Sequence, residues 1–128
     1  MATWQFQPRG ASIGSARRFV ASALVGWAGA SETADAVLLT SEVVTNAVVH
    51  AGPHGPDDEI VIKVHRCVDL VRVEVTDTHP GVPVVGDGAV DKAGGRGLVL
   101  LESLASAWGV TRCGPGKVLW FEVQAEER

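Results

Sequence analysis

The sequence predicts an α+β fold, a two-layer α/β sandwich in which a mostly antiparallel sheet is covered on one face by about three helices. Runs with period-2 alternation indicate strands that have one wet face. Runs with one apolar side at helical spacing stand between them and can cover the other face of the sheet. The length of 128 residues, with 46% hydrophobic and 20% charged residues, is that of one globular domain over residues 1–128.

The first half of the chain predicts one strand and two helices. TWQFQ alternates Trp4 and Phe6 with polar neighbours, which indicates a short half-buried strand. The run ASIGSARRFVASALVGWAG has apolar residues at helical spacing: Ile13, Val20, Leu24 and Trp27. Gly29 is expected to end this helix, and Ser31 is expected to cap the next one. The glycines and prolines of AGPHGPDD then end the second helix.

The second half predicts four strands, a long loop and a helix. Two period-2 runs come first, and their apolar residues are Ile60, Ile62 and Val64, then Val71, Val73 and Val75. The segment from Thr78 to Arg96 is rich in glycine and proline and has no periodicity, which is typical of a lid or a binding loop. GLVLLESLASA predicts the last helix, and WGVTRC and GKVLWFEV predict two strands joined by the turn GPG.

Bulk properties exclude several classes of function. The net charge of −4 and the lack of basic runs argue against a surface for nucleic acid or anionic membranes. The start MATWQFQPRG has no signal-peptide pattern, and no segment approaches the roughly 20 apolar residues of a membrane span. Cys67 and Cys113 form neither a disulfide framework nor a zinc site. We therefore expect a cytoplasmic protein that contacts neither nucleic acid nor membrane directly.

The second helix carries two polar residues that its apolar neighbours do not explain. In LLTSEVVTNAVVHAG, Glu42 and Asn46 lie four residues apart and share one face. The strongest apolar stripe lies roughly opposite and consists of Val37, Val44 and Val48. A solvated face is one interpretation. The other is the wall of a pocket, which the apolar Leu39 and Val49 on the same side favour.

The strand VRVEVTD ends on a carboxylate with an unexpected direction. Asp77 has the same parity as Val71, Val73 and Val75, so within a strand it points toward the helices. An inward carboxylate costs several kcal/mol unless a donor binds it. The alternative is that the strand has already ended and Asp77 caps a turn.

A glycine cluster opens the last helix in GGRGLVLL. Glycines before a helix let backbone N–H groups approach a phosphate, and the helix amino end adds partial positive charge. The cluster is not a Walker loop, because no G-x-x-x-x-G-K-[ST] occurs in the chain. It is not a Rossmann fingerprint either, since no βαβ unit precedes it.

The three features together resemble the GHKL superfamily of ATP-binding domains, named after gyrase, Hsp90, histidine kinases and mismatch-repair ATPases. E-x-x-x-N, a strand-end Asp and G-x-G-L follow one another like the N, G1 and G2 boxes of that superfamily. Four stretches resemble the small bacterial anti-sigma-factor serine/threonine kinases: ARRFV, SEVVTNAVVHAG, GGRGLVLLESLASAWGV and GKVLWFEV. The resemblance covers nearly the whole chain and implies a Bergerat-type ATP-binding fold.

The resemblance also implies a role for each motif residue. Glu42 would be the general base, and Asn46 would hold Mg²⁺ on the triphosphate of ATP. Asp77 would accept a hydrogen bond from the adenine amine. The remaining binding residues come from the G1 and G2 boxes: Gly81, Gly95, Arg96, Gly97 and Leu98. Residues 78–96 would form the ATP lid, with Arg96 supplying positive charge near the γ-phosphate.

At two positions the chain departs from the family pattern. In the G1 box, DTHPG has His79 where the family has its first glycine, which would reshape or weaken adenine binding. After GK in the last strand the family often has Thr, whereas this chain has Val118 and lacks that hydroxyl near the adenine. Both departures concern nucleotide affinity, which the resemblance therefore predicts less firmly than it predicts the fold.

The resemblance implies an anti-sigma factor that is also an ATP-dependent serine/threonine kinase. Such a protein holds a sigma factor inactive and phosphorylates a small antagonist protein. No hairpin with a phospho-accepting histidine occurs, so a complete histidine kinase is not expected. Exposed surfaces of the first helix and the sheet would accommodate the homodimer found among relatives. The alternative is a non-catalytic module that regulates transcription by sequestering a partner protein.

Overall fold

The computed structural model describes residues 1–49, 58–77, 99–113 and 116–124, with only the backbone of Val49 and Cys113. Its elements are β1 (Ala2–Phe6), α1 (Gly10–Ala23), α2 (Ala30–Val49), β2 (Ile60–Arg66), β3 (Leu70–Asp77), β4 (Ala107–Cys113) and β5 (Gly116–Gln124). Residues 99–104 are also helical. This order of strands and helices confirms the one predicted from the sequence.

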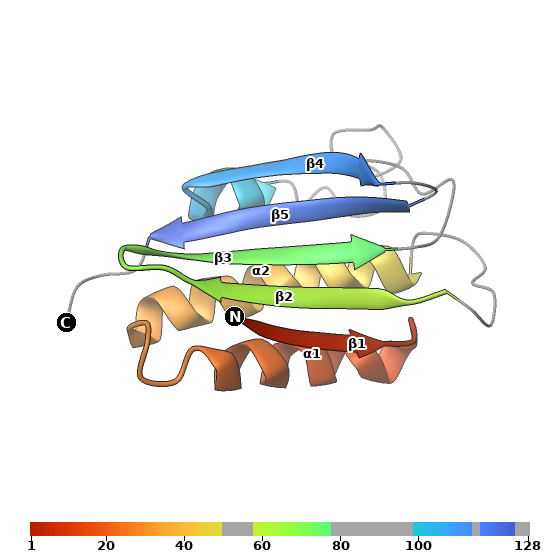
Figure 1. The fold of residues 1–128 in the computed structure, drawn as a ribbon, viewed down its shortest axis with the longest axis horizontal. Helices are drawn as coiled ribbons and strands as arrows, with labels where there is room; N and C mark the ends of the chain where they lie inside the picture. The colour runs from red at the N-terminus through yellow and green to blue at the C-terminus, as the bar shows by residue number, and fades with distance from the viewer. Residues whose placement is uncertain (50–57, 78–98, 114–115, 125–128) are drawn as a thin grey trace.

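The five strands form one sheet in the order β1-β2-β3-β5-β4. Every neighbouring pair is antiparallel. Figure 1 shows α1, α2 and the helical residues near 100 together behind the sheet, while the front of the sheet carries no described helix. The predicted two-layer α/β sandwich with an antiparallel sheet is therefore confirmed.

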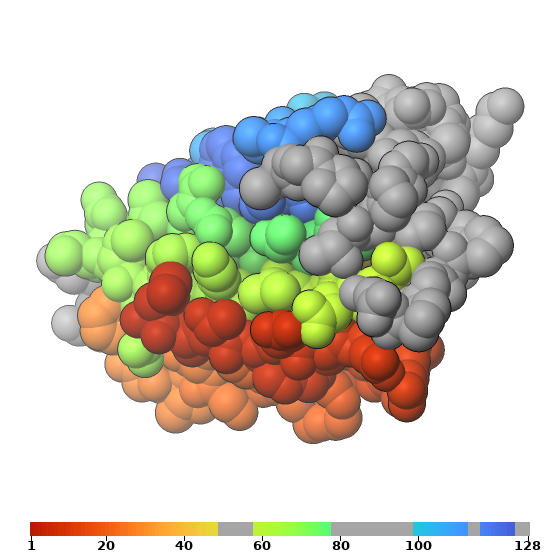
Figure 2. Space-filling view, turned by 45° about the vertical axis from the view of Figure 1, so that its right-hand side comes forward, coloured from red at the N-terminus to blue at the C-terminus, as the bar shows by residue number. Residues whose placement is uncertain are grey.

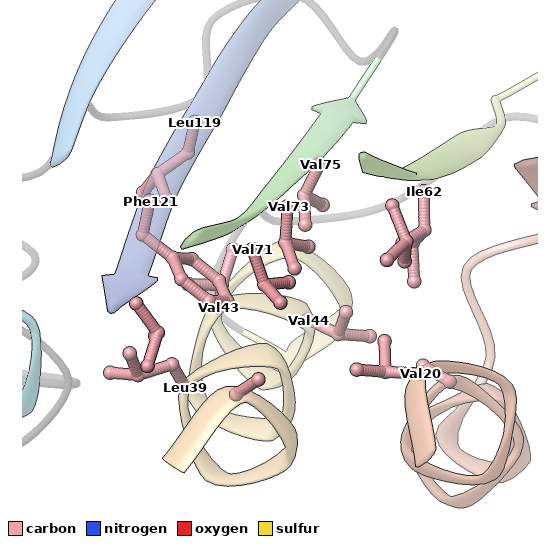
Figure 3. Packing of buried hydrophobic residues seen from close by; sticks show 14 of the residues in the cluster. Val20, Leu39, Val43, Val44, Ile62, Val71, Val73, Val75, Leu119 and Phe121 are labelled. Atoms are coloured by element: carbon pink, nitrogen blue, oxygen red, sulfur yellow. The ribbon is translucent and has the colours of Figure 1, made fainter. Parts of the chain in front are cut away.

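The core lies between the sheet and the helices. In β3, every second residue from Val71 to Asp77 is buried, and the residues between them are half-buried. Figure 3 shows the β3 valines and Phe121 of β5 directed toward α2, with Val20 of α1 beside them. Burial of a Val, Leu or Phe side chain contributes about 1.5–3 kcal/mol. This packing holds α2 against the middle of the sheet.

The buried stripe of α2 differs from the predicted one. The side chains with the least exposure are Ala36, Leu39, Thr40, Val43, Val44 and Ala47. Val37 and Val48 are only half-buried, so the prediction that they centre the stripe with Val44 is wrong. The buried hydroxyl of Thr40 is satisfied within the helix, because it donates to the Ala36 carbonyl at 2.8 Å.

The connection between α1 and α2 also differs from expectation. α1 ends at Ala23, before Trp27, and Gly26 turns the chain with a φ of 74° that favours glycine. Trp27 is 43% exposed and lies under the Arg66 guanidinium instead of continuing the core stripe. The carbonyl of Gly29 accepts from the Thr33 amide at 2.9 Å, so α2 begins before Ser31 and that residue is not its cap.

The open face of the sheet carries a charged network around a tryptophan. Arg72 lies 3.0 Å from Glu74 and 3.1 Å from Glu122, and its guanidinium lies 4.2 Å from the Trp120 ring centre. The indole rests on Gly109, where an added Cβ would lie 2.9 Å from Trp120 Cζ2. Figure 2 shows the strands of this face side by side, from β1 in red to β4 and β5 in blue.

Candidate functional site

The described motif residues come from segments that meet at one end of the sandwich. Glu42 and Asn46 belong to the carboxyl-terminal half of α2, and Asp77 is the last residue of β3. Figure 1 shows the carboxyl ends of α2 and β3 and the amino end of β5 on the same side of the molecule. Residues far apart in the sequence, from 42 to 117, are thus brought to one end of the fold.

The flank of α2 that bears Glu42 and Asn46 is neither core nor fully solvated. Both side chains are half-buried. By helical spacing they border the buried stripe on the side of Leu39, rather than lying opposite to it. A carboxylate and an amide at such a border can reach a ligand beside the helix while their backbone stays fixed by the core.

Asp77 points into the interior, as its parity predicts. It is 2% exposed and lies within β3, in register with Ile60 of β2 and Lys117 of β5. The alternative that the strand has ended and Asp77 caps a turn is therefore wrong. A carboxylate buried at the end of the sheet needs donors, and it can accept a hydrogen bond from an amine of a ligand.

Lys117 is a site residue that the sequence analysis missed. It is 8% exposed, and its Nζ lies 3.8 Å from Asp77 Oδ2. Burial lowers the pKa of Lys117, the Asp77 carboxylate counteracts this, and the positive charge of Arg112 lowers the pKa further. No local signal marked it, because the four residues that follow it are all apolar; its direction is set by the register that pairs it with Asp77.

Val118 has a different position from the one assumed for it. It pairs with Thr76 on the open face of the sheet and is half-buried. A threonine hydroxyl at this position would therefore not point toward the helices. The expectation that Val118 removes a hydroxyl from the adenine site is wrong, and the side chain on the helix-covered face at this end is that of Lys117.

Several predicted residues lie outside the described residues. These are Gly81, Gly95, Arg96, Gly97 and Leu98, together with His79 and the lid at 78–96. Their assignments stay predictions. Within the described ranges, no group of three or more His, Cys, Asp or Glu side chains could hold a metal ion. No described helix is long and apolar enough to cross a membrane.

The described residues fit an adenine nucleotide with Mg²⁺. The buried Asp77 oxygen suits an amine donor of a base, and the Asn46 amide oxygen is a hard ligand that suits Mg²⁺. Because Mg²⁺ usually binds through few protein ligands and substrate phosphates, no acidic cluster is needed. Glu42, one helical turn before Asn46, adds a carboxylate that can accept a proton.

Comparisons with known proteins support this interpretation of the fold. The model of the histidine kinase-like ATPase domain matches residues 6–123. Curated proteins give no significant match. Among solved structures, the RsbU and RsbW domains of Rv1364c from Mycobacterium tuberculosis are similar, with 18% identity and a TM-score of 0.67 over 99% of this chain and 34% of that chain.

Two histidine kinases are also similar in structure. The blue-light activated histidine kinase of Erythrobacter litoralis EL346 has 24% identity and a TM-score of 0.63, over 92% of this chain and 42% of that chain. The catalytic domain of histidine kinase ThkA has 16% identity and a TM-score of 0.54, over 98% of this chain and 99% of that chain.

These identities show a shared fold, and the chain spans only about a third of the length of the structure with the RsbW domain. The family match covers nearly all of the chain, from the end of β1 to the end of β5. The chain therefore belongs to the family of histidine kinase-like ATPase domains, the GHKL superfamily.

Proposed function

We propose that the chain is an ATP-binding anti-sigma factor and a serine/threonine protein kinase. It phosphorylates an anti-sigma-factor antagonist and sequesters a sigma factor. Three findings support this proposal: membership of the histidine kinase-like ATPase family, the similarity to a structure that contains an RsbW domain, and the motifs that resemble anti-sigma-factor kinases.

The observation that carries the proposal is that three motif residues belong to two segments, α2 and β3, whose carboxyl ends lie on the same side of the sandwich. Asp77 is buried at the end of β3, and Glu42 and Asn46 border the core on the half of α2 that reaches this end. An adenine-binding acceptor, a Mg²⁺ ligand and a general base are the groups that phosphoryl transfer from ATP requires of this fold.

Asn46 and Glu42 have separate roles in the proposed reaction. Asn46 would hold Mg²⁺, for which its amide oxygen is a suitable hard ligand, and the ion when bound would supply positive charge beside the phosphates. Glu42 accepts the proton of the attacking hydroxyl, which belongs to a serine or threonine of the antagonist. Since catalysis of this reaction is mostly positioning and electrostatics, the fixed backbone of α2 contributes by holding both side chains in place.

The proposed partners are proteins. They are a sigma factor and a small antagonist protein, and the exposed surfaces of α1 and the sheet would accommodate a homodimer. The net charge of −4 gives no support for direct contact with nucleic acid. Activity on cytoplasmic transcription proteins implies a cytoplasmic location.

A second candidate is a binding module that sequesters its partner without catalysis. His79 at a glycine position of the G1 box favours this candidate, because a side chain there would restrict the approach of adenine to the backbone. The module would keep the fold and the partner surface, and ATP would be dispensable for its action.

Replacement of Glu42 by Gln separates the two candidates. Glu42→Gln keeps the volume and removes the proton acceptor, so transfer to the antagonist should slow by roughly 10²–10⁴-fold while Mg·ATP binding stays nearly intact. Glu32→Gln is the matched control, since it makes the same change in the first turn of the same helix and should leave transfer unchanged. The measurement is phosphate incorporation into a verified antagonist, with sigma-factor binding measured in parallel.

Asn46→Ala should behave differently from Glu42→Gln, with loss of Mg²⁺-dependent nucleotide affinity as well as transfer. Equal phosphate transfer by the wild type and Glu42→Gln would exclude Glu42 as the general base. A wild-type protein that binds the sigma factor but transfers no phosphate to a verified antagonist would establish the sequestering module.

A further inference from the structure

The buried ammonium group of Lys117 lies beside Asp77, the carboxylate that we assign to adenine binding. Lys117 and Asp77 stand opposite each other in the β3–β5 register, on the helix-covered face of the sheet. Their exposed fractions are 8% and 2%. A lysine at a core-facing position is costly unless its charge is paired and its N–H groups are hydrogen-bonded.

The pair lacks the geometry of a purely structural ion pair. Lys117 Nζ lies 3.8 Å from Asp77 Oδ2, whereas a charge-assisted hydrogen bond has a length of about 2.7–2.9 Å. Among the described residues, Asp77 is the one ion-pair partner of Lys117. An ammonium group has three N–H donors, so this long contact leaves donor capacity for a ligand.

The surrounding charges also favour a ligand with an acceptor atom. On the other side of β5, the residue in register with Lys117 is Arg112 of β4, which has the same charge. Burial and Arg112 both disfavour the charged ammonium, and Asp77 is the group that counteracts them. A hydrogen-bond acceptor placed near Nζ would offset part of this cost.

We propose that Lys117 is a specificity-determining residue that recognises the adenine ring together with Asp77. Its ammonium donates to the ring nitrogen N1 of adenine, while Asp77 accepts from the adjacent exocyclic amine. This inference rests on the proposed nucleotide function of the site. The amine and N1 lie next to each other on one edge of adenine, so a protein acceptor beside a protein donor is complementary to that edge. The ion pair keeps the two side chains close before the nucleotide arrives.

The test compares ATP with 1-deaza-ATP, in which a C–H group replaces N1. Equilibrium titrations with Mg²⁺ are made on the wild type, Lys117→Met and Lys63→Met. The wild type should bind ATP at least about tenfold more tightly than 1-deaza-ATP, because a hydrogen bond to a charged donor is lost. Lys117→Met should bind the two nucleotides almost equally. Lys63→Met, on the open face of β2, should keep the wild-type ratio.

A wild type that binds ATP and 1-deaza-ATP equally would overturn the inference. So would a Lys117→Met protein that binds both more weakly but keeps the wild-type ratio, because Lys117 would then act only on the structure. Failure of the wild type to bind either nucleotide would overturn the proposed nucleotide function and this inference with it. Binding of ATP with a ratio near one would overturn this inference alone.

Lys117→Gln serves as a second variant if Lys117→Met does not fold, as judged by circular dichroism. Its amide keeps a neutral donor, which forms a hydrogen bond roughly half as strong as a charged one. The preference for ATP over 1-deaza-ATP should therefore fall below that of the wild type. An unchanged preference in Lys117→Gln would contradict a direct contact between the ammonium and the base.

Discussion

The two faces of the sheet carry ionised side chains in contrasting arrangements. On the open face, Arg72 reaches Glu74 and Glu122 at 3.0 and 3.1 Å and also lies over the Trp120 ring. On the helix-covered face, Asp77 and Lys117 are far more buried, yet they approach only to 3.8 Å. The contacts between charged side chains are therefore shorter on the half-buried open face than between the more buried Asp77 and Lys117.

This difference supports the proposal that the two groups of charged side chains have different roles. Half-buried charges that bind one another form a structural network whose contribution is modest, because water competes for each partner. A buried pair with a long contact destabilises the fold relative to apolar residues of similar volume. The presence of such a pair at the end of β3 and β5 agrees with the proposed ligand site there.

The largest expected effect breaks the buried pair. Asp77→Ala leaves the Lys117 ammonium buried without its carboxylate, so the free energy of unfolding should fall by about 3–5 kcal/mol. Urea unfolding followed by far-ultraviolet circular dichroism measures this change. The control is the double variant Asp77→Ala, Lys117→Met, which removes both charges and should regain most of the loss. A double variant no more stable than Asp77→Ala would contradict this account of the pair.

A smaller effect should follow from disturbing the open face without touching a charge. Gly109→Ala places a methyl group where a Cβ lies 2.9 Å from Trp120 Cζ2, so the indole must move away from Arg72. Overpacking of this kind costs about 1–3 kcal/mol of stability. Gly14→Ala in α1 is the matched control, because its Cβ meets only the Arg18 side chain at 3.5 Å. It should be neutral or stabilise by up to about 1 kcal/mol.

Nucleotide affinity should be unchanged in both glycine variants, since neither position belongs to the α2, β3 and β5 end. If Gly109→Ala proved as stable as the wild type, the indole would be free to move. The contact with Trp120 would then not be part of a rigid network.

The smallest effect concerns Glu74 and depends on pH. Burial alone would raise the pKa of Glu74, but the Arg72 hydrogen bond and the charges of His65 and Arg72 lower it below its ordinary value of 4.5. The carboxylate therefore contributes stability that is present above pH 4.5 and is lost as the pH falls through the lower pKa of the folded state. Glu74→Gln should reduce stability at neutral pH by up to about 1 kcal/mol.

Thermal unfolding at a series of pH values measures this difference between the wild type and Glu74→Gln. The difference should shrink steadily as the pH falls below 4.5. High salt should also reduce it, because the network is partly exposed to water. A difference that stayed constant into strong acid would show that the charge of Glu74 does not contribute to stability.

The alternating strands allowed a large part of the fold to be predicted from the sequence. In VRVEVTD the valines alternate with polar residues and Asp77 has the parity of the valines, so an inward Asp77 was predicted provided that the strand continues to it. The alternative of a turn cap was excluded only by the register of Asp77 with Ile60 and Lys117. The helix α2 was less informative because apolar residues occupy most of its circumference. It packs against both the sheet and α1, so Val37 and Val48 are half-buried beside the core without being part of its centre.

Lys117 could not be placed by the same reasoning. In GKVLWFEV the four residues from Val118 to Phe121 are all apolar, so the period-2 pattern does not show which face is buried. The register with β3 decides it, since Lys117 lies opposite Asp77 and Val118 opposite Thr76. A local sequence pattern does not contain such long-range pairing. Sequence reasoning therefore missed Lys117, the partner of the buried Asp77.

Titration of Mg·ATP into three proteins tests the central claim, that this end of the sandwich binds a nucleotide through Asp77. The proteins are the wild type, Asp77→Asn and Arg72→Met. Asp77→Asn replaces an acceptor oxygen by a donor facing the adenine amine, so affinity should fall by about 1–3 kcal/mol. Arg72→Met disrupts the network on the opposite face and should leave affinity unchanged. Equal affinity of the wild type and Asp77→Asn, or a loss of affinity in Arg72→Met alone, would contradict the claim.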